Sequence, residues 1–420
     1  MRGLFRLRAD REQRRSAAEP TAYLSVIDPG QENFRLLVVQ VGQGQASVWG
    51  WAERSDWAED SSGAGGLLAT CQRVASQAEE MARDRAGRWL LPDHMLVGLP
   101  ASQLRGRAWS VTHHRPRPEQ PVEERELMAL LSRALRLAVN RLLGVEYEAS
   151  EAAEPEWLLV EAVPVALSID GRGVTDPVGF RGRELGATVF AALARAEVIA
   201  AWQAVAQQLE FSTLTLTAAP LALAAVQQGP SGILMDVGAL STDLTWWRNG
   251  QPLLLDSLPE GGRALTEALE KKWGLTSKRA ERLKRAYAEA RLEDDAREQV
   301  LDVLAPVLQN WFEEAETAFA RMYADWESPL PQRLQLLGGG SMLPEVAESA
   351  AVLAYSERLR FARYPKVERF EPTDVAGVVN RTDLGRGAGD SVALALAAWA
   401  ARENRVPDRP TRILRELCSG

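Results

Sequence analysis

Short apolar runs alternate with amphipathic helical stretches along most of the chain. The runs at residues 22–30, 34–41 and 94–100 have the length of buried strands, and the first two lie close enough to form a hairpin. By contrast, the apolar residues from Leu127 to Leu142 recur at helical spacing on one face. This alternation of strands and helices predicts an α/β fold.

The second half of the chain repeats this order. The segment GILMDVGALSTDLTWW (232–247) predicts a strand, a tight turn and a second strand. Charged helices are expected over about 262–325, and the apolar run 391–401 predicts a buried helix. Each half opens with a strand that ends in an Asp-X-Gly turn, at Asp28 and at Asp236. The sequence therefore predicts a coarse duplication.

Composition narrows the classes of function. The 420 residues carry a net charge of -8, so the chain offers no overall basic surface for nucleic acid. Cys71 and Cys418 lie far apart in the sequence and provide neither a metal-ligand spacing nor a disulfide framework, which suits a reducing cytoplasm. No run approaches the ~20 apolar residues that span a bilayer. We expect a cytoplasmic globular protein.

Three glycine-containing turns carry the candidate chemistry, at residues 28–30 (DPG), 236–238 (DVG) and 338–341 (GGGS). Glycine lets the backbone approach a ligand closely. Backbone N–H groups in such turns can cradle phosphate oxygens, and carboxylates beside them can hold Mg²⁺ through water. The order and separation of the turns resemble the two phosphate loops and the adenosine loop of the actin/Hsp70/sugar-kinase ATPase superfamily.

Further motifs resemble the cell-division actin homologues of the FtsA type. The segment ALSIDGRGVTDPVGFRGRELGATVFAAL (166–193) is similar to the FtsA segment that returns from its inserted subdomain to the core. LPEGGRALT (258–266) and AERLK (280–284) resemble two further FtsA motifs. The resemblance covers about residues 20–400 and implies an α/β, actin-like fold, duplicated on a ribonuclease H-like unit, with a small inserted α+β subdomain of the SHS2 type.

The resemblance also implies domain boundaries. They are a basic arm (1–20), the first part of domain I (21–93), the inserted subdomain (94–170), the return of domain I (171–230), domain II with a helical subdomain (231–335), the adenosine loop and the completion of domain I (336–402), and a tail (403–420).

The same resemblance implies a site for ATP or ADP with Mg²⁺. Asp28, Asp236 and Asp243 would hold the metal through water, and no residue is assigned as catalytic. The implied nucleotide-binding residues are Asp28, Gly30, Gln31, Asp236, Gly238, Ser241, Thr242, Asp243, Gly262, Glu281, Lys284, Gly338, Gly339, Gly340 and Ser341.

Both phosphate loops depart from the FtsA pattern. Hydroxyl residues and a lysine usually follow the first Asp-X-Gly, whereas this chain has Gln31, Glu32 and Asn33. Ala239 and Leu240 replace glycines of the second loop, and their side chains restrict the backbone and fill space. We predict weak binding of nucleotide and at most a very weak ATPase. The alternative is that the glycines serve only as tight turns and that Glu281 and Lys284 form a plain helical pair.

Both ends of the chain are candidates for membrane contact. Residues 1–15 carry six arginines against Asp10 and Glu12, with Leu4, Phe5 and Leu7 between them. Such an arm can bind an anionic surface. In the tail, Ile413, Leu414 and Leu417 form one apolar face of a short predicted helix. We expect a protein at the inner face of the cell membrane, held by one or both ends.

The implied function is a scaffold in bacterial cell division. Its expected partners are further copies of itself, in a filament or a dimer, the tubulin-like division GTPase FtsZ, and an anionic membrane, with no nucleic acid. A pilus-assembly scaffold of the PilM type and a nucleotide-free pseudo-ATPase remain as alternatives. A true phosphotransferase or ATP hydrolase is less consistent with the eroded phosphate loops.

Overall fold

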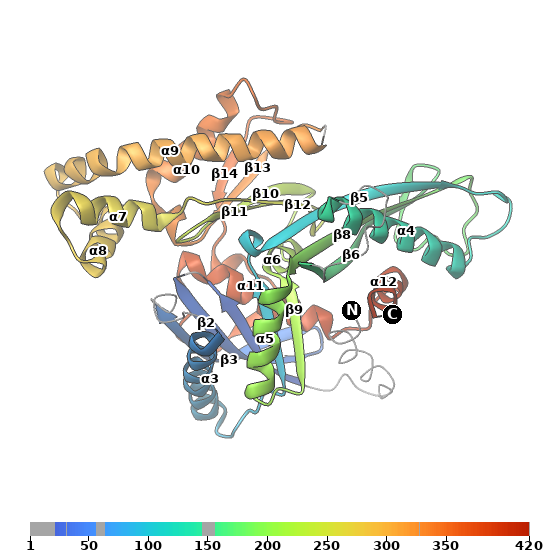
Figure 1. Ribbon diagram of the computed structural model, residues 1–420, viewed down its shortest axis with the longest axis horizontal. Coiled ribbons are helices and arrows are strands. Elements are labelled where there is room, and N and C mark those ends of the chain that lie inside the picture. The colour runs from blue at the N-terminus through green and yellow to red at the C-terminus, as the bar shows by residue number, and fades with distance from the viewer. Residues whose placement is uncertain (1–21, 31, 56–63, 145–155, 327, 420) are drawn as a thin grey trace.

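The computed structural model describes residues 22–30, 32–55, 64–144, 156–326 and 328–419. Figure 1 shows two α/β halves, one above the other, with a smaller sheet-and-helix unit projecting to one side. The chain has the actin-like ATPase fold, as the sequence predicts. The candidate site lies between the two halves.

The first half is built on a six-stranded sheet. β1, β2 and β3 form an antiparallel meander, and β4 and β9 continue the sheet parallel to β1. The strands in sheet order are β15 (Val378–Asn380), β3 (Gln45–Ser55), β2 (Asn33–Gly42), β1 (Ala22–Pro29), β4 (His94–Leu99) and β9 (Thr213–Ala218).

The second half repeats this topology. β10, β11 and β12 form an antiparallel meander, and β13 and β14 follow parallel to β10. These strands are β10 (Ser231–Val237), β11 (Thr242–Arg248), β12 (Gln251–Leu258), β13 (Arg333–Leu337) and β14 (Lys366–Arg369). The two halves thus share one order of strands, which confirms the duplication expected from Asp28 and Asp236.

Helices cover the sheets and explain why their strands are so apolar. α3 (Ala64–Ala86) and α11 (Ser391–Glu403) both pack against β2 and β3, and β2 is buried along most of its length. The remaining helices of the first half are α5 (Ala196–Gln208) and α6 (Ala219–Ala225). The second half carries α7 (Gly262–Trp273), α8 (Ser277–Ala288), α9 (Asp294–Trp326) and α10 (Pro344–Val352).

An inserted unit follows β4. It comprises β5 (Leu104–His114), α4 (Glu124–Leu143), β6 (Trp157–Ile169), β7 (Arg172–Val174) and β8 (Glu184–Arg195). The apolar face of α4 fills a core separate from that of the two halves. β5 also pairs with β12 at Arg107 and Leu254, so the unit extends the second sheet to nine strands.

These boundaries differ from the expected 94–170. Residues 94–99 form β4, which lies between β1 and β9 in the first sheet, whereas β7 and β8, assigned to the return segment, belong to the inserted unit. A short apolar run predicts a buried strand without indicating its sheet, because periodicity carries no information on pairing partners.

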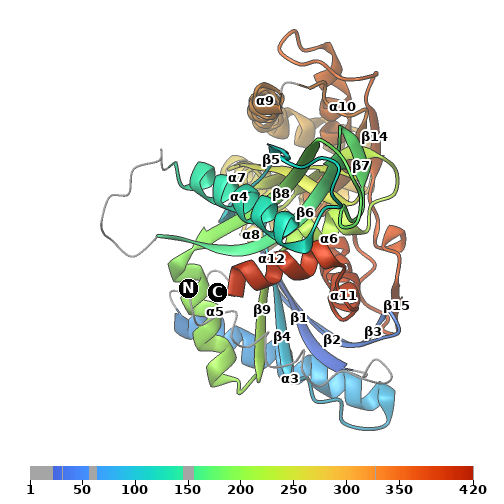
Figure 2. The ribbon, with the colours of Figure 1, turned by 90° about the vertical axis from the view of Figure 1, so that its right-hand side faces the viewer.

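The C-terminal helix has a different environment from the one expected for a membrane anchor. In Figure 2, α12 (Arg409–Ser419) lies below α4, close to the inserted unit. Ile413 and Leu414 are fully buried in the core of that unit, and Leu417 packs partly against it. Arg412 and Arg409 pair with Glu124 of α4 at 2.9 and 3.4 Å. This face is therefore not free for a bilayer in this conformation.

The other membrane candidates, Leu4, Phe5 and Leu7, lie outside the described residues, as does Gln31. Within the ranges that the structure describes, no helix combines the length and apolar character needed to cross a bilayer.

Candidate functional site

The three glycine turns meet at one cleft between the halves. Turn one (28–30) ends β1, turn two (236–241) joins β10 to β11, and turn three (338–341) follows β13. β1 has a parallel neighbour in β4, and β10 has one in β13. The turns lie at the carboxyl ends of β1, β10 and β13, and open α/β sheets bind ligands at the carboxyl ends of their parallel strands. The cleft has a volume of about 460 Å³, within the usual range for small-molecule sites.

Most of the predicted nucleotide residues surround this cleft. Ser241 and Asp243 line a smaller hollow of about 80 Å³ that shares Asp28 and Asp236 with it. Thr242 and Ser341 are buried beneath the surface, where each hydroxyl donates to a backbone carbonyl, of Glu260 and Gly338 respectively. The predicted residues that line the main cleft are Asp28, Gly30, Asp236, Gly238, Gly262, Glu281, Lys284, Gly338, Gly339 and Gly340.

Close packing explains why turn three needs glycine. Gly338 has φ +82°, and a Cβ there would lie 2.4 Å from Oδ1 of Asp236. A Cβ on Gly340 would lie 2.5 Å from Val237. At Gly339, by contrast, no described atom would lie within 4 Å of a Cβ. Gly339 therefore faces open space at the cleft, while its neighbours are required by packing.

Three amides at or beside turn two are already bonded within the protein. Gly238 N–H donates to the carbonyl of Ser241 at 3.0 Å. At the start of α7, Gly262 N–H donates to the carbonyl of Gly238 and Arg263 N–H to that of Ala239, at 2.9 and 2.8 Å. An N–H group satisfied in this way is not free for a phosphate oxygen.

The ammonium group of Lys284, on α8, is likewise bonded within the protein. Lys284 Nζ donates to the carbonyl of Gly262 at 2.8 Å and to Thr266 Oγ1 at 2.9 Å, and it pairs with Glu281 at 2.7 Å. An ammonium group has three donors, so its hydrogen-bonding capacity is filled. Glu281 also accepts from Arg285 at 2.9 Å. Burial raises the pKa of Glu281, but its basic partners outweigh burial and lower it overall.

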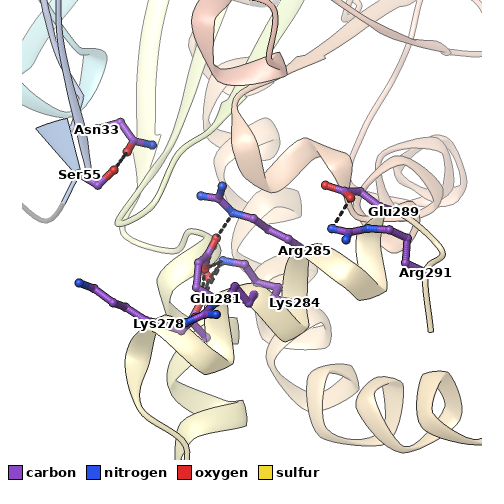
Figure 3. Close-up of polar contacts among 11 residues, drawn as sticks. Asn33, Ser55, Lys278, Glu281, Lys284, Arg285, Glu289 and Arg291 are labelled. Carbon is purple, nitrogen blue, oxygen red and sulfur yellow. Dashed lines mark hydrogen bonds and ion pairs between the residues drawn. The ribbon is translucent and has the colours of Figure 1, made fainter. Parts of the chain in front are cut away.

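Figure 3 shows this network on α8 and, on the opposite wall of the cleft, the hydrogen bond from Ser55 Oγ to Asn33 Oδ1. Arg285 extends from the network and is well exposed. It is the cleft cation with the most freedom to meet a ligand among the described lining residues.

The three carboxylates expected to hold Mg²⁺ fit that role poorly. Asp28 accepts from Arg35 at 3.2 Å. Asp243 accepts from the hydroxyls of Ser241 and Ser257 and from the backbone N–H of Ser102, at 3.1, 2.7 and 3.2 Å. Among the described residues, no group of three or more His, Cys, Asp or Glu side chains is arranged to hold a metal ion.

Electrostatics also disfavour an ionised triad of carboxylates. Burial, reinforced by the charges of Asp243 and Asp28, raises the pKa of Asp236 to about 7. Burial likewise raises the pKa of Asp28 and of Asp243 above their usual range. Burial therefore disfavours the ionised form of these groups, and the ionised form is the one that binds a metal ion.

The charge of the cleft opposes a polyphosphate. Seven acidic side chains line it against three basic ones, Arg35, Lys284 and Arg285. Glu32, which follows turn one, has a raised pKa because of burial and the nearby charge of Glu281. The cleft has open space beside Gly339, but acidic side chains outnumber basic ones among its described lining residues, which disfavours a polyphosphate.

Arg35 and Asp390, like Arg285, are among the cleft residues that were not predicted from the sequence. Arg35 lies on β2, inside the apolar run NFRLLVVQV, and is buried. Its Nε pairs with Asp390 at 2.8 Å. The available signal was a charged residue in the middle of a buried strand, because such a side chain is rarely buried without a partner.

Comparisons with known proteins bear on the fold. No family model matches the chain, and neither does any curated protein. One similar solved structure is the PilM–PilN type IV pilus biogenesis complex, with 19% identity, a TM-score of 0.59, and coverage of 93% of this chain and 100% of that one. At this identity the likeness shows the fold alone.

Two further solved structures match the chain with lower TM-scores. The ethanolamine utilization protein EutJ from Carboxydothermus hydrogenoformans has 14% identity, a TM-score of 0.45, and coverage of 90% and 91% of the two chains. MreB5 of Spiroplasma citri bound to ADP has 10% identity, a TM-score of 0.43, and coverage of 91% and 96%.

Proposed function

We propose that the chain is a non-hydrolysing actin-fold scaffold of a membrane-linked bacterial assembly, with a cleft that holds adenine nucleotide weakly. The observation that carries this proposal is the bonding of turn two. Its Gly238 N–H, and the Gly262 and Arg263 N–H groups beside it, are paired within the protein. An ATPase needs such donors free to stabilise a transferring phosphoryl group.

A direct test compares binding with turnover. Titration calorimetry with ATP and with ADP should give weak heats, and a steady-state phosphate-release assay should give a rate no higher than that of a protein-free blank. Turnover clearly above the blank, lost in Asp236→Asn, would contradict the scaffold proposal. A complete absence of binding would favour the nucleotide-free pseudo-ATPase instead.

Two kinds of assembly remain candidates, each supported by a separate observation. The motifs in 166–193 and 258–284 favour the cell-division type, which would place the protein beside FtsZ at the inner face of the membrane. The pilus-assembly type is favoured by the match over 93% of this chain to a chain of the PilM–PilN type IV pilus biogenesis complex. It is also consistent with the buried Ile413 and Leu414, because the division type would use a free C-terminal helix at the membrane.

Co-sedimentation separates these two candidates. The full chain is incubated with FtsZ polymers in one arm and with the organism's PilN-like protein in the other. Pelleting with FtsZ alone supports division, and capture by the PilN-like protein alone supports pilus assembly. Size-exclusion chromatography of the chain by itself tests for the dimer or filament that both types imply.

A further inference from the structure

One guanidinium pairs with two carboxylates that line the cleft. The side chain of Arg35 is only 10% exposed and pairs with Asp28 at 3.2 Å and with Asp390 at 2.8 Å. A third carboxylate, Glu53, lies 3.9 Å away and is half exposed. Arginine stays protonated at every physiological pH, so this positive charge is permanent.

The two close partners belong to different parts of the cleft. Asp28 ends β1 and begins turn one. Asp390 ends the segment 387–390, whose Ala388 carbonyl accepts from Gly338 N–H, the first amide of turn three. Through Arg35, turn one is therefore tied to the segment that supports turn three, without any ligand between them.

A bound divalent cation normally supplies positive charge to carboxylates in such clefts, and it needs oxygen ligands that are free to coordinate. Here Asp28 is engaged by Arg35, and Asp243 is held by three donors. The residues present do not fit the cation that the fold would lead one to expect.

We propose that Arg35 is a built-in cation that replaces the divalent metal of this cleft, so that the cleft is assembled without metal. Arg35 neutralises Asp28 and Asp390 and holds turn one against the support of turn three. Any ligand in the cleft is consequently bound with the same affinity in Mg²⁺ as in a chelator. This inference goes beyond the scaffold function and does not depend on nucleotide binding.

The test uses the full chain without nucleotide. Melting temperature is measured by circular dichroism in millimolar Mg²⁺ and in EDTA, and binding of Mn²⁺ is followed by its electron paramagnetic resonance signal. For the wild type we expect equal melting temperatures in the two buffers and no loss of free Mn²⁺ signal. Arg35→Met should melt lower in EDTA, because Asp28 and Asp390 lose their shared cation.

In Arg35→Met the freed carboxylates should accept a cation. Mg²⁺ should then raise the melting temperature by a few degrees through mass action, and Mn²⁺ should bind once per chain. Adding Asp28→Asn to this variant should abolish both effects. Arg35→Lys, which keeps the charge, should remain insensitive to metal.

Arg115→Met is the matched control. Arg115 is another buried arginine, paired with Glu126 at 2.7 Å in the inserted unit, away from the cleft. Its loss should lower the melting temperature without creating any response to Mg²⁺ or Mn²⁺. A general effect of salt on a destabilised protein would appear equally in both variants.

Two results would overturn the proposal. One is Mn²⁺ binding to the wild type that disappears in Asp28→Asn, because the metal site would then still be present. The other is an Arg35→Met variant that responds to metal no more than Arg115→Met does. If Arg35→Met does not fold, the wild-type measurement and Arg35→Lys still decide the question. The proposed scaffold function would fail separately, through ATP turnover or through the absence of any assembly partner.

Discussion

Replacing Asp236 by asparagine should make the protein more stable at alkaline pH and leave it nearly unchanged in acid. The pKa of Asp236 rises from 3.8 to about 7, chiefly because of burial and then because of the charges of Asp243 and Asp28. The folded state therefore holds a proton that the unfolded state releases above about pH 4.

The direction in which stability changes with pH follows from the number of protons that the folded and unfolded states bind. Below about pH 4 both states are protonated, so the carboxyl carries no penalty. Between about pH 4 and pH 7 the folded state binds more protons, so the free energy of unfolding falls as pH rises. Above about pH 7 the free energy of unfolding falls no further on account of Asp236, because folding then buries a group that is charged in both states. The shift of about three units corresponds to ~4 kcal/mol, and partial exposure of Asp236 reduces the expected value to about 2–4 kcal/mol.

Urea denaturation of the wild type and of Asp236→Asn measures this difference directly. At or just below about pH 4 the two midpoints should be close, at about pH 5 part of the difference should already be present, and by about pH 8 the variant should be the more stable protein. The comparison between two proteins cancels the titration of most other groups. A variant that is less stable than the wild type at alkaline pH would show that Asp236 is ionised and favourably partnered when folded, and the burial argument would fail.

Three further predictions address the cleft, the tail and the arm. Gly339→Val should fold normally and weaken nucleotide binding, because its side chain enters open space at the cleft; calorimetry and thermal melting check both parts. Leu414→Ala should cost about 2–5 kcal/mol in urea denaturation, as a fully buried leucine is lost, whereas Val406→Ala, at an 85% exposed site, should change little. Deleting residues 1–15, which carry six arginines, should reduce salt-sensitive pelleting with anionic vesicles; equal pelleting of both forms would place the anchor elsewhere.

The α/β class could be predicted because it is encoded by local patterns, whereas the actin-like fold was implied by the resemblance to the FtsA type. The hairpin from Ala22 to Gly42, the buried helix 391–403 and the amphipathic face of α4 all appear in the sequence as periodic apolar residues. The duplication was also visible, in Asp28 and Asp236. Pairing between distant segments was not visible, which is why β4 was assigned to the inserted unit and α12 was expected to be free.

The location of the candidate site was predictable, but its bonding was not. The resemblance to the actin/Hsp70/sugar-kinase superfamily implied that Gly30, Gly238 and Gly340 lie at one site, and the structure places all three at one cleft. The hydrogen bond from Lys284 Nζ to the carbonyl of Gly262 depends on how α8 packs against α7, and no local pattern encodes this packing. Arg35 could have been singled out from its buried strand, although its two acidic partners lie on other segments.

The glycines of turn three show why motif retention alone does not establish nucleotide binding. Packing alone requires Gly338 and Gly340, because a Cβ at either position would collide with Asp236 or Val237. These two glycines would persist in a scaffold that had lost its nucleotide, and so they do not discriminate between the alternatives. Gly339 is different, since its Cβ position is clear of every described atom by 4 Å. A valine there tests the ligand and not the fold. Nucleotide affinity that is unchanged in Gly339→Val would therefore mean that the turn is retained for packing alone.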